Sequence, residues 1–323
     1  MSLAVNLLKS PFALKKPSPK PEGVLLRAAL FSDTHITKAM YRRSLLIPAL
    51  KKLGRFAPDL VVFAGDCTDN GSEPNWRAFA ADVKKYCKIE NVIVAIGNHD
   101  TWESYACPHD YPAARERWLR FAGEIMGKRP ENVWFLKVYN GTPFFILGSE
   151  DTCVGATLGE AQLSWLENAL NEAEKARPGG PFVVVCHSPM NRTHGVGENE
   201  RGMGLEGDAS PRLQAILNAH ENVFYLCGHT HVGLQHGGER ATIQRAGKTV
   251  TSVCLPCFEY GEVFNGRYAT SGYPAIGTGL LMDVYGDRVT FTGAGFLRGK
   301  EIPSFTHTAA LKNENVKKNE KKM

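Results

Sequence analysis

Short apolar runs alternate with amphipathic helical patterns along the first two thirds of this 323-residue chain. This order is typical of repeated β-α-β units with buried parallel strands. A mostly β ending follows, which favours two packed sheets with helices outside. The expected strands lie at 25–31, 60–64, 92–96, 133–138, 144–147, 182–186, 223–227, 249–255, 279–285 and 288–293, and the expected helices at 44–56, 74–87, 113–126, 160–176 and 211–219.

The two ends of the chain differ from its middle in composition. Residues 10–22 hold four prolines and three lysines, a composition that favours an extended arm. We therefore expect a flexible basic arm at 1–22, one domain at 23–300 and a flexible lysine-rich tail at 301–323. The excess positive charge lies near both termini, so a basic groove for nucleic acid is not indicated, although contact of the tails with nucleic acid or membrane lipid stays open.

The cysteines and the apolar segments indicate the cellular location of the chain. Its eight cysteines are scattered, several of them within apolar strand-like runs, which favours reduced buried thiols over a disulfide framework. The apolar run at 3–8 has its lysines after it, whereas a secretory signal has its charges in front. No run of eighteen apolar residues occurs, so no transmembrane segment is expected. The sequence predicts a cytoplasmic protein.

Acidic, amide and imidazole residues follow five of the expected strands. Because ligands bind at the carboxyl ends of strands in open α/β sheets, these clusters are expected to converge. Residues two apart on an extended segment point the same way, which lets each D-x-H or H-x-H pair reach one centre. Adjacent residues cannot share that direction, so only one of residues 98 and 99 is expected to face a metal. The clusters are Asp33-Thr34-His35, Gly65-Asp66, Gly97-Asn98-His99-Asp100, Cys186-His187 and Gly228-His229-Thr230-His231.

The ordered set D-x-H, G-D-x-x-D, G-N-H-D, a lone His after a strand, and G-H-T-H resembles the signature of calcineurin-like metallophosphoesterases. The resemblance implies an α/β fold, a four-layer α/β/β/α sandwich, that holds two divalent metal ions. Mixed nitrogen and oxygen ligands suit manganese, iron or zinc without selecting among them. One implied ion takes Asp33, His35, Asp66 and His231, and the other takes Asp66, Asn98, His187 and His229, with Asp66 as the bridge.

The same resemblance assigns roles beside the ligands. His99 is implied as general acid or phosphate clamp, and Asp69 as the residue that orients it. Asp100 is expected to hold backbone in a turn. Many relatives carry two consecutive histidines at the fourth cluster, where this chain has Cys186 before His187, so Cys186 is expected to pack inward.

The implied activity is hydrolysis of phosphate esters, with attack by a hydroxide that bridges the two metal ions. The form G-D-x-T-D-x-G most resembles the class III cyclic-nucleotide phosphodiesterase branch, so the expected partner is a small phosphorylated substrate, with a phosphodiester such as a cyclic nucleotide favoured. A phosphomonoesterase and a nucleotide-diphosphate pyrophosphatase remain alternatives. A non-catalytic scaffold, like the retromer subunit that has this fold, is a more remote one.

The glycine-rich segment 190–209 leaves the fourth cluster directly and is expected to cover the site. Loops of this length are uncommon in a compact domain unless they serve binding. His194, Asn199 and Arg201 are its expected substrate contacts, and a plain solvent-exposed loop is the alternative.

Overall fold

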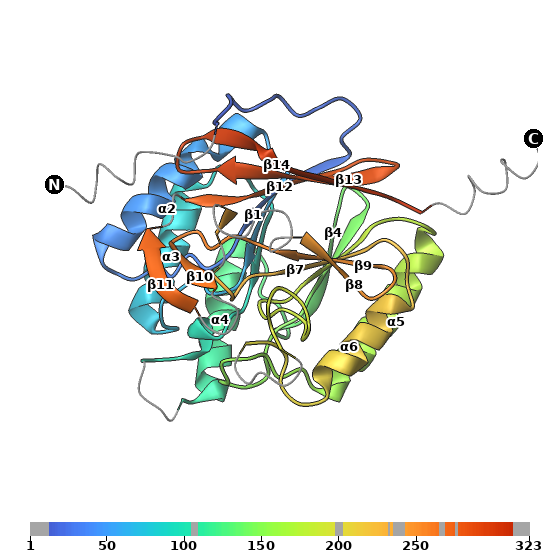
Figure 1. Cartoon of the computed structure of the whole chain (residues 1–323). Coiled ribbons are helices and arrows are strands. Elements are labelled where there is room, and N and C mark those ends of the chain that lie inside the picture. Colours follow the sequence, from blue (N-terminus) through green and yellow to red (C-terminus); the bar gives the residue numbers. More distant parts are fainter. Residues whose placement is uncertain are drawn as a thin grey trace, which may run out of the picture.

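The computed structural model describes residues 13–104, 109–197, 203–231, 233–234, 243–264, 269–274 and 277–312 (Figure 1). The first of two six-stranded sheets has the strand order β14-β13-β12-β1-β2-β3. Its parallel part is formed by β1 (Leu26–Phe31), β2 (Leu60–Ala64) and β3 (Val92–Ala95). Its antiparallel part is formed by β12 (Thr278–Val284), β13 (Arg288–Gly295) and β14 (Lys300–Ala310).

The second sheet has the order β4-β5-β6-β7-β9-β8. Parallel pairing joins β5 (Thr142–Ile146), β6 (Phe182–Val185), β7 (Val223–Cys227) and β9 (Val250–Cys254). The strands β4 (Phe135–Tyr139) and β8 (Ile243–Ala246) pair antiparallel at the two edges. A separate pair is formed by β10 (Tyr260–Phe264) and β11 (Ala269–Pro274).

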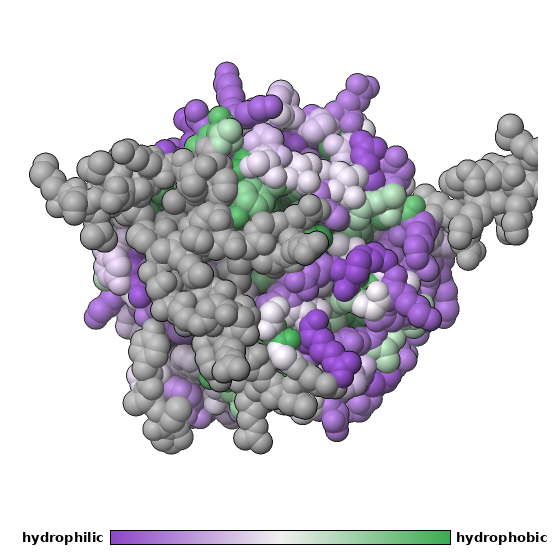
Figure 2. All heavy atoms as spheres, viewed as in Figure 1, coloured by the Kyte–Doolittle hydropathy of each residue, from purple (hydrophilic) through white to green (hydrophobic). Residues whose placement is uncertain are grey.

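Helices cover the outer face of each sheet (Figure 1). The first sheet is covered by α2 (Met40–Lys52), which continues as the 3-10 turn η1 (Leu53–Phe56), and by α3 (Glu73–Tyr86) and α4 (Tyr111–Met126). The second sheet is covered by α5 (Glu160–Ala176) and α6 (Ala209–Asn218). In the view of Figure 2, the side on which α5 and α6 lie is mostly hydrophilic, as expected for amphipathic helices.

The buried apolar residues form three clusters, one for each interface between layers. The alternation of side chains along β1 shows this, because Ala29 and Phe31 pack against the helices while Ala28 and Leu30 pack against the second sheet. The third cluster joins the second sheet to α5 and α6. The predicted four-layer α/β/β/α sandwich is therefore confirmed. None of the described helices is long and apolar enough to cross a membrane.

The predicted end of the domain at residue 300 is wrong. Residues 300–310 form β14, which pairs with β13, and Ile302 is fully buried. From Pro303 to Ala310, half-buried residues of β14 alternate with exposed ones, because one face of this edge strand is open to solvent, and its composition therefore resembles a tail. Part of the expected N-terminal arm is also held, since Lys15 bridges to Glu301 and Lys20 pairs with Asp59.

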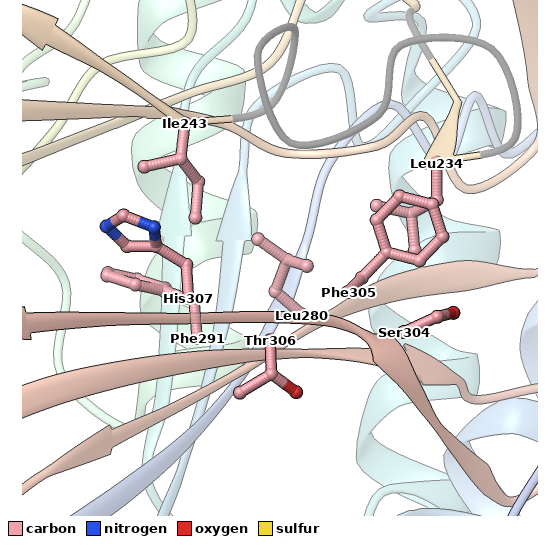
Figure 3. Close-up of a pocket in the computed structure, with 8 residues that line it drawn as sticks. All are labelled: Leu234, Ile243, Leu280, Phe291, Ser304, Phe305, Thr306 and His307. Carbon is pink, nitrogen blue, oxygen red and sulfur yellow. The ribbon is translucent and has the colours of Figure 1, made fainter.

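A cavity of about 30 Å³ lies between the two sheets, beside β8 and β14. Figure 3 shows apolar side chains facing this space from both sides, among them Ile243, Leu280 and Phe305. This cavity is too small and too apolar to be a site for a phosphorylated substrate.

Candidate metal centre

The predicted ligand residues all follow the carboxyl ends of parallel strands. Asp33 and His35 follow β1, Asp66 follows β2, Asn98 follows β3, His187 follows β6, and His229 and His231 follow β7. The first three strands belong to one sheet and the last two to the other. Because the two sheets pack face to face, the ligand residues that follow β1, β2 and β3 meet those that follow β6 and β7.

One cluster contains Asp33, His35, Asp66 and His231, whose ligand atoms lie within 4.8 Å of one another. His231 Nε2 is 3.1 Å from Asp33 Oδ1 and 3.1 Å from His35 Nε2. The Asp66 Oδ2 atom is 3.8 Å from His35 Nε2. All four side chains are buried.

A second cluster contains Asp66, His187 and His229, again with ligand atoms within 4.8 Å of one another. His187 Nε2 is 3.0 Å from Asp66 Oδ2. The amide oxygen of Asn98 is 3.0 Å from His229 Nδ1, which adds a fourth ligand atom beside this group. The structure thus brings together all seven residues that the sequence predicted as ligands.

Asp66 belongs to both clusters through a single oxygen. Its Oδ2 faces His187 and His35, while its Oδ1 accepts a hydrogen bond of 2.9 Å from the His99 backbone N–H. The two clusters therefore do not each use an oxygen of their own from this carboxylate. The second oxygen fixes the side chain to the β3 loop.

The chemistry of these atoms fits a cation. Asp66 Oδ2 and His187 Nε2 are buried and lie 3.0 Å apart, and within the described part of the chain neither atom makes a hydrogen bond of regular geometry. His187 Nδ1 donates to the Ala64 carbonyl at 2.9 Å, so in the neutral ring Nε2 carries a lone pair. Burial alone lowers the pKa of His187, but the Asp66 and Asp33 carboxylates raise it to about 10.

Five of the seven predicted ligands have a left-handed backbone. The positive φ angles are 54° at Asp33, 42° at His35, 46° at Asp66, 70° at His229 and 52° at His231. Such conformations cost of order 1–3 kcal/mol each and persist where surrounding structure enforces them. The D-x-H and H-x-H pairs therefore converge through left-handed turns, and the extended geometry expected from the spacing is wrong.

Two glycines make room for the ligands. A Cβ atom at Gly97 would lie 2.2 Å from Asp66 Oδ1, and a Cβ atom at Gly65 would lie 2.5 Å from His187 Nδ1. Gly65 also has a φ of 95°, which side chains rarely adopt. Both positions therefore need glycine for the ligand side chains to stay where they are.

His99 stands beside the first cluster, and Asp69 contacts it. The His99 Nδ1 atom donates to the Asp69 backbone carbonyl at 2.7 Å, because a carbonyl oxygen can only accept. The His99 ring centroid lies 4.6 Å from that of His35 and 4.4 Å from that of Trp102. Asp69 therefore contacts His99 through its main chain, while its carboxylate is hydrogen-bonded to Arg42.

Two further predictions around the site are confirmed. Asp100 is buried and accepts hydrogen bonds from the backbone N–H groups of Gly97, Cys67 and Thr68 at 3.0, 3.2 and 2.9 Å. Burial, together with the nearby Asp66 charge, raises the pKa of Asp100 to about 6. Cys186 is buried in the core between the second sheet and its helices.

Residues 190–197, the first described part of the segment 190–209, are packed more tightly around His194 than a solvent loop. His194 is 5% exposed, with Nε2 2.9 Å from Ser252 Oγ, and its backbone N–H donates to Gln244 Oε1 at 2.9 Å. These contacts hold the segment against β8 and β9 and do not favour contact of His194 with a substrate. Asn199 and Arg201 lie outside the described residues.

Sequence motifs missed several residues near the ligands. Arg42 and Glu259 contact one another at 3.3 Å beside His35, although 217 positions separate them in the chain. Ser149 and Val154 line a small pocket beside Asn98 and His187. None of these residues belongs to a recognisable motif, so only spatial proximity identifies them.

A family model described as calcineurin-like phosphoesterase matches residues 26–233. A curated protein of Arcobacter nitrofigilis named "Probable glycerophosphodiester phosphodiesterase GpdQ" is 29% identical over 205 residues, which is 62% of this chain and 65% of that protein. Among solved structures, a Thermus thermophilus sulfate thiohydrolase SoxB has 13% identity and a TM-score of 0.44, covering 91% of this chain and 58% of that one. Vps29 of Chaetomium thermophilum has 12% identity and a TM-score of 0.32, and the match covers 88% of this chain and 95% of that one.

Proposed function

The chain belongs to the calcineurin-like phosphoesterase family, and from this premise we propose that it is a dinuclear metal-dependent phosphodiesterase. The observation that carries the proposal is the pair of facing clusters that share Asp66 Oδ2. A non-catalytic scaffold has no need for seven convergent ligand side chains on strained backbone. The intact ligand set therefore favours an enzyme.

We assign the ligands as the clusters group them. Asp33, His35, Asp66 and His231 would hold one divalent ion, and Asp66, Asn98, His187 and His229 would hold the other. Two such ions supply Lewis-acid activation of a water nucleophile and neutralise charge on the phosphoryl group. The ligand types suit manganese, iron or zinc.

We assign proton donation to the leaving group to His99. Its Nδ1–H is held by the Asp69 carbonyl, so in the imidazolium form His99 would give the proton on Nε2 to the departing alkoxide and keep the one on Nδ1. The Asp66 carboxylate fixes the backbone of His99 through Oδ1, so the proton donor and the shared ligand are aligned by one contact. Trp102 supports the His99 ring.

Phosphodiesters are the substrate class that we favour. The matched relative is named as a glycerophosphodiester phosphodiesterase, and the G-D-x-T-D-x-G form resembles cyclic-nucleotide phosphodiesterases. The match covers 65% of that relative, so its substrate enters here as a proposal. A cytoplasmic location stays a prediction.

A substrate panel tests the proposal. The purified chain, loaded in turn with Mn²⁺, Fe²⁺ and Zn²⁺, is assayed on a glycerophosphodiester, a cyclic nucleotide, a phosphomonoester and a nucleotide diphosphate. We expect metal-dependent turnover that is highest on one of the phosphodiesters. Higher turnover on the monoester or the diphosphate would contradict the substrate class, and no turnover with any metal would favour a scaffold.

A further inference from the structure

We propose that Arg42 is a positioning residue that holds Asp69 in place and thereby fixes the orientation of His99. This inference rests on the proposed phosphodiester hydrolysis. Arg42 lies in the first turn of α2, directly after the loop that carries Asp33 and His35. It is neither a predicted ligand nor part of a sequence motif.

Arg42 joins three segments that are distant in sequence. Its Nη1 atom donates to Asp69 Oδ1 at 2.6 Å, to the His35 carbonyl at 3.1 Å and to Glu259 Oε2 at 3.3 Å. Its side chain is 17% exposed, and both carboxylates are 13% exposed. Charge-assisted hydrogen bonds in such a shielded place are stronger and more directional than those on an open surface.

Asp69 stands between the guanidinium of Arg42 and the imidazole of His99. Its carboxylate contacts Arg42, and its backbone carbonyl accepts from His99 Nδ1 at 2.7 Å. Its own N–H donates to the Ile36 carbonyl at 3.1 Å, so the residue is held at three points. A displacement of Asp69 would therefore turn the His99 ring.

Removal of the Arg42 guanidinium would displace Asp69 through repulsion between two carboxylates. Asp69 and Glu259 contact the same nitrogen of Arg42, so without it two carboxylates face each other in a shielded place. The two anions would repel, and Asp69 would move away from the position that orients His99.

The effect should appear in one step of the reaction. An ester with an alkoxide leaving group needs a well-placed proton donor, whereas a nitrophenyl ester does not. Glycerophosphoethanolamine and bis(p-nitrophenyl) phosphate are the two probes, assayed at pH 8 on the manganese-loaded full chain. We expect Arg42→Ala to lower kcat on the first roughly 10- to 100-fold, as for a small misplacement of a reacting group. Loss on the second should stay within about threefold, with metal content unchanged.

A neighbouring arginine of the same helix provides the control. Arg43 pairs with the buried carboxylate of Asp82 at 2.6 Å, on α3. Arg43→Ala removes an equivalent ion pair away from the ligands, so it should lower stability without changing the ratio of the two rates. Arg42→Lys keeps the charge but not the planar group, so it should give an intermediate ratio even if Arg42→Ala folds poorly.

A double variant tests the route through His99. In the His99→Ala background, Arg42→Ala should add less than about threefold on glycerophosphoethanolamine, because the proton donor is already absent. Equal losses on both esters, loss of bound metal, or a full additional loss in the double variant would each overturn the role of Arg42. If the wild type is active but the variants give any of those results, only the role of Arg42 is overturned and the proposed function stands. If the wild type is inactive on both esters, the proposed function and the role of Arg42 are both overturned.

Discussion

The replacement Asp66→Asn removes the one oxygen that both clusters share. In the wild type, Oδ2 faces His187 and His35, and Oδ1 accepts from the His99 N–H at 2.9 Å. If the amide oxygen of asparagine stays on His99, its NH₂ group points at the metal positions. If the amide turns over, the NH₂ group faces the His99 N–H, donor against donor. Neither orientation serves both contacts.

The magnitude follows from the lost charge. A unit charge contributes about 4 kcal/mol per opposite unit charge at 4 Å with an effective dielectric constant near 20. Each tenfold change in affinity corresponds to about 1.4 kcal/mol. The affinity for each divalent ion should therefore fall by more than about 10³-fold, and turnover should fall with it.

Metal content after dialysis is the assay. The wild type and Asp66→Asn are loaded with Mn²⁺, dialysed against metal-free buffer, and measured by elemental analysis and by turnover. Asp82→Asn is the matched control, since Asp82 is also buried but pairs with Arg43 away from the ligands. Retention of two ions per chain with near-normal turnover by Asp66→Asn would refute the shared-ligand role.

Three further replacements test other parts of the structure. In Gly97→Ala, the new Cβ would lie 2.2 Å from Asp66 Oδ1, so bound metal should be lost; a variant that keeps its metal would show that the backbone there has room. The buried Arg27 guanidinium contacts the Asp283 carboxylate at 2.7 and 2.8 Å, and Asp283→Ala removes that carboxylate. The free energy of unfolding, measured in a urea titration, should therefore fall by about 3–5 kcal/mol. A change under about 1 kcal/mol would contradict this prediction. His99→Ala should cost roughly 10²- to 10⁴-fold on an alkyl phosphodiester and far less on a nitrophenyl ester, with metal retained. Equal losses on the two esters would indicate a phosphate clamp, and loss of metal would show that His99 is itself a ligand.

The sequence determined the layers and the meeting of the ligand residues. Hydrophobic periodicity sets which segments are buried strands, and the carboxyl ends of parallel strands share an edge. The residues that follow those ends must then lie together. The predicted clusters after β1, β2, β3, β6 and β7 therefore converge in the structure as expected.

The edge strand β14 depended on tertiary structure. Its polar, proline-containing sequence forms a strand only because β13 supplies hydrogen-bond partners and the core accepts Ile302. Local propensity cannot reveal such a partner, since strand stability comes from cross-strand packing. For the same reason, β8, β10 and β11 were not predicted.

Within the site, tertiary structure also decided which atom of each residue acts. Asp66 uses Oδ2 for both clusters, and Asp69 uses its carbonyl for His99 and its carboxylate for Arg42. Residue type and spacing specify which groups are present, but not which oxygen faces which neighbour. That choice depends on contacts between segments far apart in the chain, such as the one between Arg42 and Glu259, because only the packed fold brings them within hydrogen-bond distance.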